Sequence, residues 1–163
     1  MKRSVVVALL VLALTASLGS AAAALDGKVY VGLTVHGSTS DHTYQVAAVS
    51  LQLTDRFAVG VGAALGEEEV NVEVHYGRGK GVYAGTYVVS SGSIEDWYAG
   101  LFFDHAVSSV FELRTHLGVY GFTADGIIVP EAWVQASYDL AGPFALLGEL
   151  GWDWLFAGLA YEF

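Results

Sequence analysis

The chain has 163 residues, of which 54% are hydrophobic and 15% are charged, with a formal net charge of −10. This acidic balance argues against a nucleic-acid partner, because phosphate binding requires clustered Lys and Arg. The absence of cysteine excludes disulfides, thiolate metal sites and a cysteine nucleophile. The length suits one domain, and the apolar content argues against intrinsic disorder.

Residues 1–24 predict a cleaved secretory signal peptide. Lys2 and Arg3 form a basic start, residues 5–14 form an apolar middle, and residues 20–24 supply small side chains for cleavage. An uncleaved membrane anchor is the alternative, but the apolar stretch is short for a membrane span. Residues 25–163 are therefore expected to form one exported domain.

From residue 28 onward, apolar residues alternate with small or polar ones, and turn residues interrupt the alternation about every ten positions. A period of two is typical of β-strands, whose successive side chains point to opposite faces. Eight strands with a longer loop remain an alternative. The pattern favours ten strands, at 28–37, 42–53, 57–66, 70–77, 81–89, 96–105, 110–121, 131–140, 144–151 and 154–163.

The turns between these strands also predict their register. In a tight antiparallel hairpin, residues directly opposite each other point to the same side of the sheet. Polar or small residues can be matched in this way across three of the turns. The expected pairs are Gln52 with Ala58, His75 with Tyr83, and Asp139 with Ala145.

The composition of the two strand faces favours a transmembrane barrel. One face is nearly pure Val, Leu, Phe, Ala and Trp, while the other is rich in Gly, Ala and Tyr with scattered charges. A soluble sandwich would hide its apolar face and expose a polar one, whereas a membrane barrel turns its apolar face to lipid. Strands of about ten residues fit a tilted crossing of a bilayer. We predict an all-β fold, an antiparallel up-and-down transmembrane β-barrel of eight to ten strands, with a soluble periplasmic barrel or sandwich as the rival.

The expected orientation has both termini and short turns on the periplasmic side. Trp97 and Trp152 would then lie at the outer end, near an acidic surface that includes Glu95, Asp96, Asp125 and Glu131. The basic residues Lys28, Arg56, Arg78 and Lys80 would lie at the periplasmic end. An aromatic girdle is expected at that same end, formed by Phe57, Tyr76, Phe103, Phe111, Tyr138, Phe144, Tyr161 and Phe163.

The last strand carries a recognisable ending, with apolar residues at every second position and a final aromatic: Leu155, Ala157, Leu159, Tyr161 and Phe163. This pattern resembles the terminal signature of bacterial outer-membrane β-barrels. The overall architecture is similar to the OmpA transmembrane domain and OmpX, or to the YfaZ type. The resemblance implies an outer-membrane location and recognition by the barrel-assembly machinery.

Six polar residues are expected to form a charge network in the lumen: Glu73, His75, Asp104, Glu112, Arg114 and His116. The favoured interpretation is structural, since buried charges must be paired. Arg114 would be the hub, neutralising Glu112, with Glu73 as the second candidate partner. A carboxylate–histidine catalytic site, or a path for protons or cations, is the alternative.

The remaining candidates for chemistry lie in the outer loops. His36 with Asp41 and His42 is the best external group, but it does not make a catalytic triad. The run of Glu67, Glu68 and Glu69 would suit divalent cations that bridge lipopolysaccharide phosphates, although such runs are usually only solvated. We predict no catalytic residues, no metal site and no cofactor.

The expected function is therefore a non-enzymatic structural or surface role in the outer membrane. A narrow, weakly cation-selective channel is the first alternative, because a small barrel is largely filled by side chains. An enzyme that modifies envelope lipids is the second. The expected partners are outer-membrane lipids, lipopolysaccharide and the assembly machinery, and the protein is expected to be a monomer.

Overall fold

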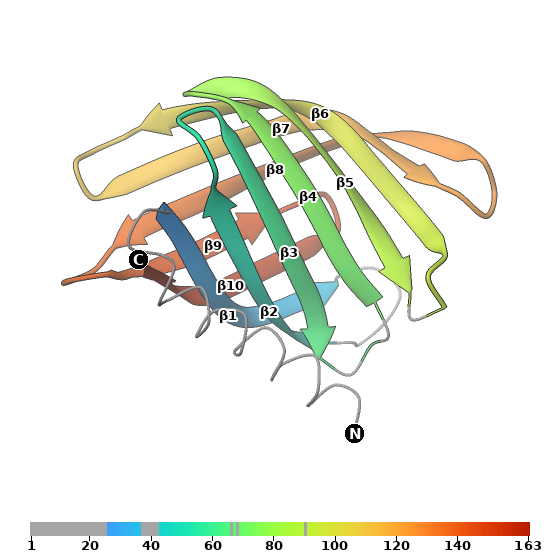
Figure 1. Cartoon of the computed structure of the whole chain (residues 1–163), viewed down its shortest axis with the longest axis horizontal. Helices are drawn as coiled ribbons and strands as arrows, with labels where there is room; N and C mark the ends of the chain where they lie inside the picture. Colours follow the sequence, from blue (N-terminus) through green and yellow to red (C-terminus); the bar gives the residue numbers. More distant parts are fainter. Residues whose placement is uncertain (1–25, 37–42, 66, 68, 90) are drawn as a thin grey trace.

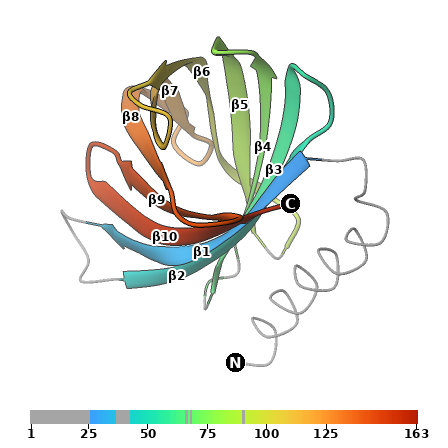
Figure 2. The same cartoon turned by 90° about the vertical axis from the view of Figure 1, so that its left-hand side faces the viewer.

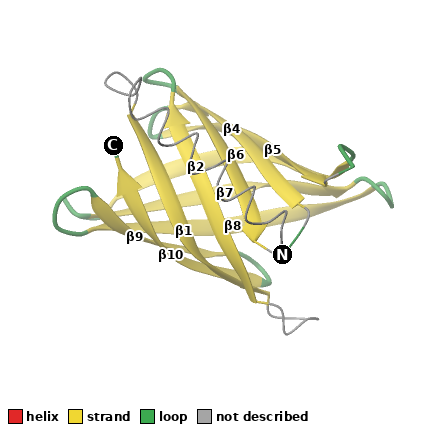
Figure 3. Ribbon diagram, turned by 60° about the horizontal axis from the view of Figure 1, so that its bottom comes forward, coloured by secondary structure: helices red, strands yellow, loops and turns green. Residues whose placement is uncertain are grey.

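A computed structural model of the chain describes residues 26–36, 43–65, 67, 69–89 and 91–163. The expected signal peptide, together with Asp41, His42 and Glu68, lies outside the described residues. The described part consists of strands and loops (Figure 3). The ten strands are β1 (Asp26–His36), β2 (Thr43–Gln52), β3 (Phe57–Leu65), β4 (Glu69–Gly77), β5 (Lys80–Val89), β6 (Ile94–Ala106), β7 (Phe111–Phe122), β8 (Ile127–Asp139), β9 (Phe144–Leu150) and β10 (Trp154–Glu162).

The strands form one closed antiparallel barrel in which each strand pairs with its neighbours in sequence. The ring is closed by β1 and β10, which pair from Lys28 opposite Glu162 to His36 opposite Trp154. Figure 1 shows the strong tilt of the strands, and Figure 2 shows the first and last strands lying side by side in the wall. The prediction of an up-and-down barrel with ten strands is confirmed.

The barrel has two distinct ends. The terminal end holds the start of β1, the end of β10 and the turns at 53–56, 78–79, 107–110 and 140–143. The opposite end holds the other connections, and we call it the loop end. At the terminal end, backbone hydrogen bonds tie neighbouring segments together, including Gly77 N–H to the Arg56 carbonyl and Glu162 N–H to the Pro143 carbonyl.

The outer wall is apolar around the barrel. Its side chains include Leu33 on β1, Val72 on β4, Leu101 on β6, Leu117 on β7 and Leu159 on β10, all of them exposed. Between the two rims, no Asp, Glu, Lys or Arg of the ten described strands occupies an outward position. The hydrophobic face of the alternation is therefore the outer one, with the charged face inside.

The register agrees with the predicted hairpins. Gln52 lies opposite Ala58, His75 opposite Tyr83, and Asp139 opposite Ala145. The segments expected as strands at 70–77 and 81–89 are β4 and β5, so the alternative of eight strands with a longer loop is wrong. For these hairpins, the facing rule together with the short turn predicted the register.

The expected start of β8 was wrong by four residues, because the strand begins at Ile127. Ile127, Ile128 and Val129 are three consecutive apolar residues followed by Pro130, so this segment shows no alternation. It is strand because it pairs with the end of β7, where Phe122 lies opposite Ile127. Here the partner strand, and not the local pattern, determines the structure.

The ends differ in their side chains as predicted, with one correction. The paired aromatics Phe57 with Tyr76, and Phe111 with Tyr138, lie at the terminal end, as do the four basic residues. Asp96 and Glu131, however, were expected at the acidic outer surface as the first residues of their strands, whereas β6 and β8 begin earlier, at Ile94 and Ile127. Their positions in the ladder turn both side chains inward, which makes the lumen more acidic than the sequence suggested.

Candidate functional site: the polar interior of the barrel

The lumen has room for large side chains because several of its inward positions are glycine. Gly85 lies against the Tyr98 ring, and Gly100 and Gly118 lie along the path of the Tyr83 side chain. A Cβ atom on Gly118 would lie 2.8 Å from the Tyr83 hydroxyl oxygen. The luminal glycines thus make room for aromatic rings.

Many of the inward side chains of β4 to β9 lie in five rows along the hydrogen-bonded ladder, which we number from the terminal end of β6 and β7. Consecutive rows are two residues apart, or about 7 Å along a strand. Row 1 holds Asp104, Arg114, Gln135 and Glu149; row 2 Phe102, His116 and Trp133; row 3 His75, Tyr83 and Glu131; row 4 Glu73, Tyr98 and Tyr120; and row 5 Asn71, Tyr87 and Asp96.

Row 1 contains the main ion pair of the interior. Arg114 donates to both carboxylate oxygens of Asp104, from Nε at 2.5 Å and from a terminal nitrogen at 3.1 Å. Its guanidinium also lies 4.7 Å from the centre of the Phe102 ring, in a cation–π contact. This pair joins the adjacent strands β6 and β7, where the two residues lie directly opposite each other.

The predicted role of Arg114 as the hub for Glu112 and Glu73 was wrong. Glu112 is exposed at the terminal end, two residues before Arg114 on β7, so the two side chains lie on successive levels of one strand. Glu73 is engaged by other groups, three rows away. Asp104 is the partner because the β6–β7 register sets it directly across from Arg114.

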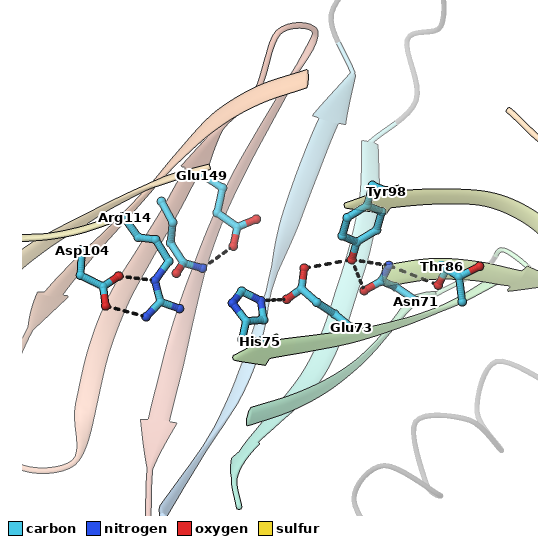
Figure 4. A network of polar contacts seen from close by, with 9 residues as sticks. Asn71, Glu73, His75, Thr86, Tyr98, Asp104, Arg114 and Glu149 are labelled. Atoms are coloured by element: carbon cyan, nitrogen blue, oxygen red, sulfur yellow. Dashed lines mark hydrogen bonds and ion pairs between the residues drawn. The ribbon is translucent and has the colours of Figure 1, made fainter. Parts of the chain in front are cut away.

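Glu73 is the centre of a second, separate network, shown in Figure 4. Its Oε1 lies 2.6 Å from His75 Nε2, and its Oε2 accepts a hydrogen bond from the Tyr98 hydroxyl at 3.0 Å. Asn71 Nδ2 lies 2.9 Å from the same hydroxyl. The network therefore connects rows 3, 4 and 5 without a break.

His116 in row 2 is fully buried, with no exposed surface. Its ring stacks on Trp133 and meets the edge of Tyr83, whose centre lies 4.7 Å away. The His75 ring lies 5.7 Å away, nearly perpendicular. Neither nitrogen of His116 has a hydrogen-bond partner among the described residues.

Several residues of the site were missed by the six-residue prediction. Gln135 donates to Glu149 at 2.6 Å across β8 and β9. Tyr120 donates to Asp96 at 2.8 Å between rows 4 and 5. The alternation assigned tyrosine to the polar strand face in general, but the hydrogen bonds of the Tyr98 and Tyr120 hydroxyls depend on the register between strands.

Other predicted positions lie away from this interior. Leu155, Ala157, Leu159 and Tyr161 occupy alternate outward positions of β10, and the backbone of Phe163 exchanges two hydrogen bonds with Gly27. Glu67 and Glu69 lie at the loop end on either side of Glu68, which is outside the described residues. No group of three or more His, Cys, Asp or Glu among the described residues is arranged to hold a metal ion.

Comparisons with protein-family models and with curated proteins found no match. Among solved structures, the chain is similar to a de novo designed transmembrane β-barrel at 21% identity and a TM-score of 0.47, covering 85% of this chain and 95% of that one. A second designed barrel, TMB2.3, shows 21% identity and a TM-score of 0.44 over 84% and 91% of the two chains. The outer membrane protein Ail of Yersinia pestis shows 10% identity and a TM-score of 0.43 over 85% and 99%.

No helix of the described residues is long and apolar enough to cross a membrane.

Proposed function

We propose that the protein is a small barrel of the bacterial outer membrane with a structural or surface role and no enzymatic activity. The observation that carries this proposal is the sidedness of the wall. Exposed Val, Leu, Tyr and Trp side chains cover the outside, and the strand carboxylates point inward. In water this arrangement would expose a large apolar surface, whereas in a bilayer it is the stable one.

The orientation that fits best has the terminal end in the periplasm. The aromatic pairs and Lys28, Arg56, Arg78 and Lys80 lie at this end. The proposed neighbours are outer-membrane lipids and lipopolysaccharide, with the barrel-assembly machinery acting on the last strand. A monomer suffices, because every strand of the described barrel is paired on both sides.

Cell fractionation combined with gel mobility tests this proposal. We expect the protein in the outer-membrane fraction, and we expect its migration to change on boiling because the folded barrel resists detergent. Recovery in the soluble periplasmic fraction, without a mobility change, would contradict the proposal and favour a soluble barrel.

The proposed assembly signal can be tested separately. We expect Phe163→Ser to reduce the amount of protein assembled in cells, with refolding in detergent unchanged. Phe144→Ser is the matched control, because it removes an aromatic side chain from the same end of the neighbouring strand. Equal assembly of the two variants would argue against a signal at Phe163.

A narrow cation-preferring channel is the second candidate. It is favoured by the excess of inward carboxylates, since Glu73, Glu131 and Glu149 lie in the lumen without a lysine or arginine bound to them among the described contacts. Recordings in planar bilayers distinguish the two candidates. The channel predicts stable openings with a preference for K⁺ over Cl⁻, and the structural role predicts none.

A further inference from the structure

We propose that the luminal rows form a relay that carries protons, but not hydrated ions, between the two ends of the barrel. The proposal rests on the membrane location proposed above. Its basis is that every row from 1 to 5 contains a group able to exchange a proton: Asp104 in row 1, His116 in row 2, His75 in row 3, Glu73 in row 4 and Asp96 in row 5.

Hydrogen bonds engage the relay groups in rows 3 to 5, nearer the loop end. His75, Glu73 and Tyr98 are joined by contacts of 2.6 and 3.0 Å, and Tyr120 holds Asp96 at 2.8 Å. The rings of Tyr98 and Tyr120 are stacked, with centres 6.4 Å apart. Glu73 and Asp96 are thus each hydrogen bonded to one member of a stacked tyrosine pair.

The hydrogen-bonded chain is interrupted at rows 2 and 3, and unsatisfied polar atoms gather there. His75 Nδ1, both nitrogens of His116 and Glu131 Oε2 are buried and have no hydrogen-bond partner among the described residues. Buried polar groups in proteins are almost always satisfied, and ordered water is the usual partner where side chains are lacking. We infer that water bridges these atoms and joins row 1 to His75.

The transfer step involves only N–H and O–H bonds. Because the Glu73 carboxylate can only accept, it fixes the His75 proton on Nε2 and leaves the lone pair on Nδ1. A proton from water binds Nδ1, and the Nε2 proton passes to Glu73 Oε1. Glu73 then releases a proton to water on the loop side. Transfer of the remaining ring proton of His75 from Nδ1 to Nε2 through water restores the starting tautomer.

The same interior should stop hydrated ions. Phe102, Tyr83 and Tyr98 are each less than 10% exposed, and they pack with His116 into one aromatic layer on the inner face of β5, β6 and β7. Arg114 lies over Phe102 next to this layer and adds a positive charge. Protons can cross such a layer along single hydrogen bonds, whereas K⁺ would have to lose its water shell.

Proton flux into vesicles tests the relay. The full-length protein is refolded into vesicles of phosphatidylcholine and phosphatidylglycerol that contain a pH-sensitive dye, and insertion is checked by flotation and by gel mobility without boiling. A pH step is applied, with valinomycin and K⁺ present to cancel the membrane potential. We expect proton flux above that of empty vesicles, and no K⁺ flux when valinomycin is omitted.

Two variants locate the path. Glu73→Gln keeps a hydrogen-bonding side chain but removes the carboxylate, and His116→Phe keeps an aromatic ring but removes both nitrogens. Each is expected to lower the proton flux at least about tenfold, which corresponds to ~1.4 kcal/mol in the barrier. Glu112→Gln is the matched control, because Glu112 is exposed at the terminal end and outside the five rows.

The outcomes separate the two proposals. If the protein inserts but the flux equals that of empty vesicles, or if neither variant lowers it relative to Glu112→Gln, the relay is wrong and the membrane location stands. If K⁺ crosses as readily as protons, the interior is a hydrated pore and the relay is also wrong. If the protein does not float with vesicles, the membrane location fails, and the relay fails with it.

Discussion

Gly118 shows how one missing side chain shapes the interior. A Cβ atom there would lie 2.8 Å from the Tyr83 hydroxyl and 2.9 Å from Gly100 Cα, so an added methyl group would force β6 or Tyr83 to move. We expect Gly118→Ala to lower the free energy of unfolding by about 1–3 kcal/mol, which is the usual cost of overpacking. Urea unfolding in detergent micelles, followed by tryptophan fluorescence, measures the change.

Gly148 provides the control for this prediction. It also lies within a strand, but the nearest atom to an added Cβ is the Phe156 carbonyl oxygen at 3.9 Å. Gly148→Ala should therefore leave the unfolding midpoint nearly unchanged. If both substitutions lowered the free energy of unfolding equally, the loss would come from replacing a strand glycine in general, and not from the limited space beside Tyr83.

The ion pair between Asp104 and Arg114 could not be predicted from the sequence. Alternation correctly placed Asp104, Glu112 and Arg114 on one face, which left two carboxylates as candidates for one guanidinium. The choice depends on the β6–β7 register, in which Asp104 lies opposite Arg114 and Glu112 opposite Ala106. Parity fixes a face, whereas an ion pair requires the exact position along the partner strand.

At the scale of the strands, most of the architecture could be predicted from the period of two. The bounds of β3, β4 and β5 agree with the expected ranges to within one residue at each end. The start of β8 could not be predicted, because an uninterrupted apolar run carries no information about faces. Asp96 and Glu131 were misplaced for a related reason, since charged residues near a strand end resemble loop residues until the partner strand is known.

The pairing of β1 with β10 can be tested by a disulfide, because the chain has no cysteine of its own. Val31 lies directly opposite Leu159, at the short Cβ separation typical of facing residues. We expect Val31→Cys/Leu159→Cys to form a disulfide on mild oxidation in the folded state. Loss of reactive thiols, measured by alkylation and mass spectrometry, reports the bond.

The mismatched pair Val31→Cys/Leu155→Cys is the control. Leu155 lies opposite Val35, four residues along β1 from Val31, which is about 13 Å away along the strand. It should keep both thiols free under the same conditions. Efficient oxidation of the mismatched pair, or none of the matched pair, would contradict the register of the closing strands.

At the scale of the whole molecule, a single charge placed on the outer wall tests whether lipid or water surrounds the barrel. Leu101 is 49% exposed on β6, where a bilayer would surround it. We expect Leu101→Arg to cost about 2–4 kcal/mol when unfolding is measured in lipid vesicles, as for arginine near the middle of other barrels. On a soluble barrel, the same surface substitution would change stability by only about 0.5 kcal/mol or less.

Trp152 provides the matched position outside the wall. It follows β9 at the loop end and is 92% exposed. Trp152→Arg should cost no more than about 1 kcal/mol in vesicles, because charge is tolerated near the interface. If Leu101→Arg were equally harmless, the outer wall would not face hydrocarbon.

The closing pair has a consequence for how the barrel forms. One edge of β1 stays unpaired until β10, the most distant strand along the chain, pairs with it. Contacts between such distant segments carry a large loop-closure entropy, so they are formed slowly. Until then, both edges of the incomplete sheet can pair with another chain, and folding competes with aggregation. The barrel is therefore expected to be hard to assemble and, once closed, slow to unfold.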